Sequence, residues 1–231
     1  AATASGTWAI EVAREHTGRP KIVMANGAYH GTHAWCTPML AGTIPSDRAN
    51  MLTFEYNDLA DLRRVVEEHD GQVAGIIVTP FRHDAFHDQE MPVEGFHHGV
   101  RQLCDDKGIV FILDDVRAGF RMHIGCKAIA NGYALSAAVG REALRPAAEN
   151  VFFTGSYFTS AVPMAAALAC LKELQASGGI DQMWHIGTML CRGLEEQGRS
   201  HGLPVNLTGP PSIPFMSFKD DAGSFGRNKA F

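Results

Sequence analysis

Hydrophobic positions along the chain follow two alternating patterns. Short uninterrupted apolar runs are typical of strands that are covered on both faces. They occupy residues 21–25, 73–79, 110–113, 134–140 and 151–153. Between the runs, apolar residues recur with helical spacing, and capping residues or glycines mark the ends. Predicted helices span residues 3–15 and begin near residues 57, 92, 161 and 180. This alternation predicts parallel strands joined by right-handed crossovers, and therefore an α/β fold.

Composition narrows the class of protein. The chain has 231 residues, of which 45% are apolar and 19% charged, as in a folded globular domain. A formal net charge of −5 argues against a nucleic-acid partner. The five cysteines are scattered, without CxxC spacing, which favours a reducing cytosol. The longest apolar stretch is too short to span a bilayer, and no signal segment opens the chain, so we expect a cytoplasmic protein without a membrane partner.

Two acidic residues, Asp114 and Asp115, directly follow the apolar run 110–113. Ligands of open α/β sheets bind at the carboxyl ends of the strands, and a buried acid there requires a cationic partner. Lys127, which lies a little further along, is a candidate amine nucleophile. Taken singly, Asp114 also fits a turn or cap residue and Lys127 a surface lysine. Together they favour a cofactor that needs both an acid and an amine.

The short distance between Asp114 and the next predicted strand, at 134–140, is difficult to reconcile with a parallel sheet. A parallel neighbour requires a crossover of roughly a dozen or more residues, usually a helix. The intervening sequence is too short for that crossover. Either the next strand is antiparallel or residues are missing near Gly125 and Cys126, and we favour missing residues.

Pyridoxal phosphate requires a lysine, a carboxylate for its ring nitrogen, an aromatic ring against its face and a helix start for its phosphate. Tyr29, which follows the first strand, is a candidate for stacking, and Val116 is a candidate for the opposite face. The candidates for the phosphate are Ala2, Thr3, Ala4, Ser5 and Ser156. Each of these residues also fits an ordinary cap or polar loop.

A rival interpretation concerns the segment RHDAFHDQ. Here His83 and His87 have the i, i+4 spacing of metal ligands on a helix, accompanied by Asp84 and Asp88. Prolines bound the segment on both sides, however, and no glutamate completes an HExxH arrangement. A polar surface loop is the favoured interpretation, and a metal-dependent hydrolase stays an alternative.

Five segments, taken in order, resemble class-III pyridoxal-phosphate aminotransferases of fold type I, especially the glutamate-1-semialdehyde aminomutase-like branch. They are AIEVAREHTGR, GAYHGTHAW, ILDDVRAGFR, KAIANGY and TGSYFTSAVPMAAALA. The resemblance implies the three-layer large domain of that fold, a mostly parallel sheet flanked by helices, with much of the terminal small domain missing. It places the large domain at residues 1–200 and the start of the small domain at 201–231.

The resemblance also implies roles for individual residues. Lys127 would form the Schiff base with pyridoxal phosphate, and Asp114 would pair with the ring nitrogen. Tyr29 and His30 match the stacking segment, and Val116 would cover the other face of the ring. Ala2, Thr3 and Ala4 match the phosphate loop, and Ser156 would reach the phosphate of a partner subunit in a homodimer with shared sites.

Three departures from the family pattern bear on activity. The phosphate loop lacks the usual glycine and acidic residue, Thr79-Pro80 replaces Glu-Pro, and the stretch before Lys127 is short. Despite these departures, the resemblance implies an aminotransferase that moves an amino group between an amino compound and a keto acid or aldehyde. An aminomutase or a racemase on the same cofactor, and a catalytically silent homologue, are the alternatives.

Overall fold

Four parallel strands form the central sheet in the computed structural model, which describes residues 2–84, 87–119, 121, 129–203 and 205–218. The strands lie in the order β2-β1-β3-β4. They are β1 (Lys21–Ala25), β2 (Met51–Phe54), β3 (Val73–Val78) and β4 (Val110–Leu113). Every neighbouring pair is parallel, as the alternation of strands and helices predicts. All four strands therefore present their carboxyl ends at one edge of the sheet.

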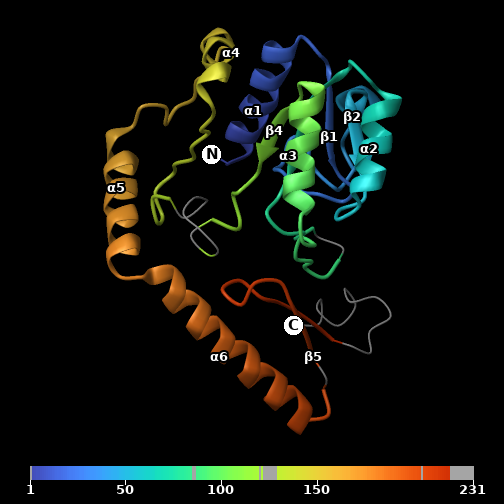
Figure 1. The fold of residues 1–231 in the computed structure, drawn as a ribbon. Coiled ribbons are helices and arrows are strands. Elements are labelled where there is room, and N and C mark those ends of the chain that lie inside the picture. Colours follow the sequence, from blue (N-terminus) through green and yellow to red (C-terminus); the bar gives the residue numbers. More distant parts are fainter. Residues whose placement is uncertain (1, 85–86, 120, 122–128, 204, 219–231) are drawn as a thin grey trace.

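Helices cover both faces of this sheet, so the fold has three layers (Figure 1). Helix α1 (Ala2–Thr17) packs on one face, where Ile22 and Met24 of β1 join its core cluster. Helices α2 (Leu59–Glu68) and α3 (Phe96–Lys107) pack on the other face, where Val23 of β1 joins the larger cluster. Residues of β1 thus alternate between two apolar layers, which explains why the strand has no polar face.

Local sequence signals account for most helix boundaries. Asp58 caps α2 by accepting a hydrogen bond from the Asp61 N–H at 2.8 Å. Gly18, with a φ of +68°, ends α1 and donates its N–H to the Arg14 carbonyl. The predicted start of α3 at residue 92 is wrong, because the helix begins at Phe96. Val93 instead donates its N–H to the Asn57 side chain and stays exposed.

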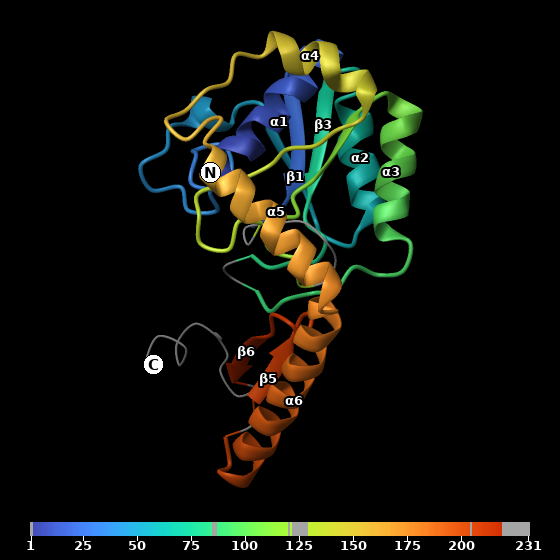
Figure 2. The ribbon, with the colours of Figure 1, turned by 90° about the vertical axis from the view of Figure 1, so that its left-hand side faces the viewer.

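The second half of the chain leads away from the sheet. It contains α4 (Arg145–Asn150), α5 (Ala161–Ala176), α6 (Gly179–Ser200) and an antiparallel hairpin of β5 (Val205–Thr208) and β6 (Phe215–Phe218). Short 3-10 helices precede β2, at Pro45–Arg48, and α4, at Glu142–Leu144. The hairpin packs on α6, and together they lie next to the carboxyl ends of the sheet, joined to it by α5 (Figure 2). Among the helices of the described part, none is both long and apolar enough to cross a membrane.

Two predicted strands are not strands in the structure. Residues 134–140 and 151–153 are irregular and largely exposed, with Val139 at 97% and Phe152 at 87% exposure. Their apolar composition suits a strand, but a strand also needs a neighbour with free backbone groups within reach. Within the described residues β4 pairs only with β3, so neither segment reaches the open side of β4.

Candidate active site

Asp114 lies at the carboxyl end of β4, where the strand leaves the sheet. Its N–H donates to the Val78 carbonyl at 2.8 Å, which continues the β3–β4 ladder by one bond. Its carboxylate is held on both oxygens. His30 Nδ1 is 2.7 Å from Oδ2, and the Val116 N–H donates to Oδ1 at 3.1 Å. The acid predicted from the sequence therefore has a fixed orientation at this edge of the sheet.

The electrostatic surroundings keep this carboxylate charged. Burial by itself raises the pKa of Asp114, but the hydrogen bond and charge of His30, followed by the Val116 N–H, outweigh it. The pKa of Asp114 lies below its ordinary value as a result. A buried acid that stays ionised is suited to hold a proton on a ligand nitrogen.

The turn that carries Tyr29 and His30 packs against the start of α1. Gly31 adopts a φ of +134°, and a Cβ built on it would lie 2.5 Å from Thr3 Oγ1. Thr3 Oγ1 also accepts a long hydrogen bond of 3.4 Å from the Thr32 N–H. The structure therefore brings the predicted phosphate residues Ala2, Thr3 and Ala4 beside the predicted stacking segment, although the two segments are far apart in sequence.

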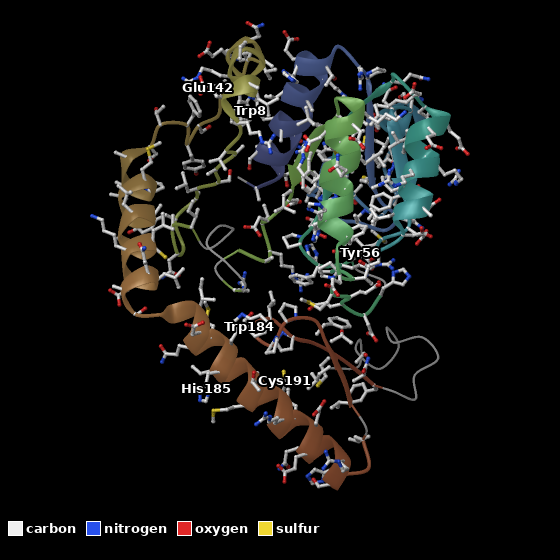
Figure 3. All side chains as sticks on the ribbon, viewed as in Figure 1. Trp8, Tyr56, Glu142, Trp184, His185 and Cys191 are labelled. Carbon is white, nitrogen blue, oxygen red and sulfur yellow. The ribbon has the colours of Figure 1, made fainter. Side chains whose placement is uncertain are left out.

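Tyr29 is 38% exposed and faces a cleft at the carboxyl ends of β1 and β3. The lining of the cleft includes Ala28, Tyr56, Thr79, Arg82 and His83. Figure 3 shows Tyr56 at this end of the domain. An exposed aromatic ring at this end of the sheet remains available to stack on a planar ligand.

The remaining predicted site residues are less constrained. Val116 is half-buried in the turn after Asp114. Ser156 is exposed in the turn that precedes α5. Lys127 lies outside the described residues.

The sequence reasoning did not identify the partner of Asp114. His30 is fully buried at its side chain and stacks on Trp35, with ring centroids 6.3 Å apart. A second histidine, His83, also has Asp114 in its electrostatic surroundings. Burial, followed by the charge of Arg117, lowers the pKa of His83 to about 4. The Tyr-His pair was visible in the sequence, but the residue that its histidine contacts was not.

Several charged side chains of the segment around His83 are paired. Arg82 Nε lies 2.5 Å and His87 Nδ1 2.9 Å from the two oxygens of Asp84, and Asn206 donates to Asp88 at 2.7 Å. In the part of the chain that is described, no group of three or more His, Cys, Asp or Glu side chains could hold a metal ion. The structure gives the metal-site alternative no support.

Comparison with known proteins identifies the class of this fold and then the family. In the computed structure, 96% of the chain superimposes on the FumI protein of Sphingopyxis sp. MTA144, solved in its pyridoxal-phosphate internal aldimine form, with a TM-score of 0.90 and 39% identity. The fold is therefore that of a fold type I large domain, as predicted. A family model described as aminotransferase class-III matches residues 2–209, and the chain belongs to this family.

Two curated relatives carry aminotransferase names. The aminopentol aminotransferase of Sphingopyxis macrogoltabida is 41% identical over 228 residues, which cover 92% of this chain and 54% of the relative. The 3-aminobutyryl-CoA aminotransferase of Cloacimonas acidaminovorans (strain Evry) is 34% identical over 236 residues, covering 95% and 56%. The chain thus spans about half the length of these relatives, and also covers only 57% of the FumI chain.

Proposed function

We propose that the chain forms the cofactor-binding part of a pyridoxal-phosphate-dependent aminotransferase. The observation that carries this proposal is the buried, charged Asp114 at the carboxyl end of β4, held by His30 beside the Tyr29 turn and the start of α1. Membership of the class-III family and the names of two relatives support it. The amino group would pass between an amino compound and a keto acid or aldehyde.

The residues present fit pyridoxal phosphate on three counts. An ionised carboxylate suits a protonated ring nitrogen, and the half-exposed Tyr29 suits a planar ring. The first turn of α1 offers N–H groups and the Thr3 hydroxyl to a phosphate. This turn contains no acidic residue that would repel the phosphate. The alanines at positions 2 and 4 leave the N–H groups of this turn in place.

When bound, pyridoxal phosphate supplies an electron sink for the carbon that loses its proton. Asp114 would hold the proton at the ring nitrogen, with His30 fixing the carboxylate. Tyr29 and Val116 would enclose the ring from its two faces. Lys127 would attach the cofactor and move the proton at the reacting carbon, because a lysine amine performs both tasks.

The assembly and location belong to the same proposal. A homodimer with shared sites would place Ser156 of one subunit at the phosphate of the other. The exposed apolar residues of the adjacent helix α5, which include Val162 and Leu168 at 61% and 60% exposure, suit such an interface. Residues 1–200 would form the large domain and 201–231 the start of the small domain, in a cytoplasmic protein.

Further residues near Gly125 and Cys126 would complete the crossover after β4. A crossover to a parallel neighbour needs roughly a dozen or more residues, usually a helix, and the sequence before Lys127 is too short to supply one.

The direct test adds pyridoxal phosphate to the purified protein and records its visible absorption band and amino transfer. We expect a band that Lys127→Ala abolishes, and stoichiometric transfer to a keto acid. An aminopentol and 3-aminobutyryl-CoA, after which the two relatives are named, are the first donors to test. Inversion at the amino-bearing carbon without transfer would indicate a racemase, and conversion within one molecule an aminomutase. No band at saturating cofactor would refute the proposal.

A further inference from the structure

One backbone carbonyl beyond the active-site turn accepts two side-chain hydrogen bonds from distant elements. The Arg121 carbonyl accepts the indole N–H of Trp184 at 2.6 Å and the hydroxyl of Ser212 at 2.8 Å. Trp184 lies on α6, and Ser212 lies between β5 and β6. Two donors on one carbonyl restrict its direction far more than one, because a carbonyl oxygen has two lone pairs to fill.

The two donors belong to one tightly packed unit. Gly187 lies one turn after Trp184 on α6, and a Cβ there would overlap the Pro211 carbonyl oxygen. The Ile213 N–H closes the same turn on the Pro210 carbonyl at 2.9 Å. Figure 3 shows Trp184 at the end of α6 that lies next to this hairpin. Trp184 and Ser212 therefore cannot move independently of each other.

A series of hydrogen bonds leads from Arg121 back to Asp114. The Arg121 N–H donates to the Ala118 carbonyl, and the Gly119 N–H donates to the Asp115 carbonyl, each at 3.1 Å. The Val116 N–H then reaches the Asp114 carboxylate. Ala118, in the middle of this turn, is fully buried. The described residues of this turn, 114–119 and 121, are thus linked by hydrogen bonds, and Arg121 at the far end is held by Trp184.

The same hairpin also contacts the loop that follows β3. The Gln89 N–H donates to Thr208 Oγ1 at 2.9 Å, and Asn206 donates to the Asp88 carboxylate at 2.7 Å. A Cβ at Gly209 would overlap the Gln89 side chain, so the two segments lie in close contact. The unit of α6 and the hairpin therefore bridges the loops after two neighbouring strands of the sheet.

We propose that Trp184 is a positioning residue, which together with Ser212 fixes the Arg121 carbonyl and thereby the turn that presents Asp114 and Val116 to the cofactor. The inference rests on the proposed function for the role of Asp114. Helix α6 and the hairpin would then help to orient the cofactor site through the Arg121 carbonyl.

The first measurement is hydrogen exchange of the peptide 114–121 without cofactor. Trp184→Phe keeps an aromatic ring and removes the N–H, and Ser212→Ala removes the second donor. Each should speed exchange in this peptide roughly fivefold, the effect of losing one ordinary hydrogen bond. Trp8→Phe is the matched control, because the Trp8 indole N–H is buried without a hydrogen-bond partner in the described residues. Exchange in Trp184→Phe equal to that in Trp8→Phe overturns the proposal.

The second measurement follows bound pyridoxal phosphate by its visible absorption as the pH is varied. Trp184→Phe should shift the midpoint of this titration, whereas Trp8→Phe should not. If the unmodified protein shows the band but Trp184→Phe shifts neither midpoint nor exchange, the positioning role is overturned and the proposed function stands. If the unmodified protein shows no band, the proposed function fails. The exchange comparison then still decides whether Trp184 fixes the turn.

Discussion

His30 and Asp114 form a buried pair, with 2.7 Å between Nδ1 and Oδ2 and side-chain exposures of 0% and 13%. The carboxylate can only accept, so the proton of this hydrogen bond resides on Nδ1. The imidazole is also stacked on Trp35, which fixes its plane. The histidine that follows Tyr29 therefore orients the acid at the end of β4.

Replacing His30 with phenylalanine should weaken cofactor binding. The substitution keeps a flat ring against Trp35 but removes the donor to Asp114, so the pKa of that carboxyl rises and its charge is less available. We expect the affinity for pyridoxal phosphate to fall roughly tenfold, in line with the loss of a charge-assisted hydrogen bond. Titration of absorbance measures it. His33→Phe is the control, since His33 is exposed in the same loop. Equal affinities in the two variants would contradict the role of His30.

His83 should make the fold sensitive to mild acid. Its pKa is lowered from 6.5 to about 4 on folding, so between these values the unfolded chain binds a proton that the folded chain does not. Stability is therefore full above about pH 6.5 and falls as the pH drops towards 4, by up to about 3 kcal/mol. Urea unfolding at several pH values measures this loss.

The variant His83→Gln isolates the contribution of this residue, because glutamine does not titrate. Its unfolding free energy should vary less between pH 6.5 and 4 than that of the unmodified protein. Asp114 contributes in a different window: its lowered pKa stabilises the fold above about pH 4, and that stabilisation is lost as the pH falls further. An unchanged slope between pH 6.5 and 4 in His83→Gln would show that other groups cause the sensitivity.

Gly31 should tolerate alanine far less well than Gly42, another glycine with a positive φ. Gly31 and Gly42 both have positive φ, +134° and +83°, but only a Cβ at Gly31 meets another group, the Thr3 side chain. We expect Gly42→Ala to cost about 1 kcal/mol and Gly31→Ala about 3 kcal/mol of unfolding free energy. Thermal unfolding of both variants gives the comparison. Only Gly31→Ala should also weaken binding of pyridoxal phosphate, since it displaces Thr3. Equal costs would mean that the contact with Thr3 is easily relieved.

Breaking the Arg82–Asp84 pair should destabilise the fold more than breaking a surface pair, because it leaves a largely buried charge without its partner. Exposure of the two side chains is 14% and 2%, against 29% and 49% for the equally short Arg101–Asp105 pair on α3. Asp84→Asn leaves a buried guanidinium without its main counter-charge and should cost about 3 kcal/mol. Asp105→Asn, at the surface, should cost much less. Chemical denaturation measures both, and a similar small cost for both variants would contradict this interpretation.

The layers of the fold could be predicted because the apolar runs that form β1 and β3 are buried on two faces. In β3 every residue is buried, and the sequence VAGIIV already shows a run without a polar position. Strand β2 was not predicted, because it has only four residues and one of them, Thr53, is exposed. Residues 134–140 show the opposite error, because they were predicted as a strand and form none. An apolar run indicates that burial is favourable, but it does not indicate whether a sheet edge is within reach.

The residues of the site could be predicted in part, for a related reason. Asp114 was identifiable because the end of a buried strand is a local feature of the sequence. Its contact with His30 joins positions 84 residues apart, and the contact of Trp184 with Arg121 joins positions 63 apart. Such contacts depend on how the layers and the hairpin pack, and neither residue type nor spacing encodes them. The spacing of the histidines around His83 also suits a metal, and the two bounding prolines and the missing HExxH glutamate were the local signals that favoured a polar loop.

Strand β4 forms one edge of the described sheet, and its residues are half-buried or exposed, with Leu113 at 46% exposure. Within the described residues, β4 pairs with β3 alone. Asp114 thus follows the outermost described strand, and its orientation is set from one side, by the Val78 carbonyl of β3 and by His30.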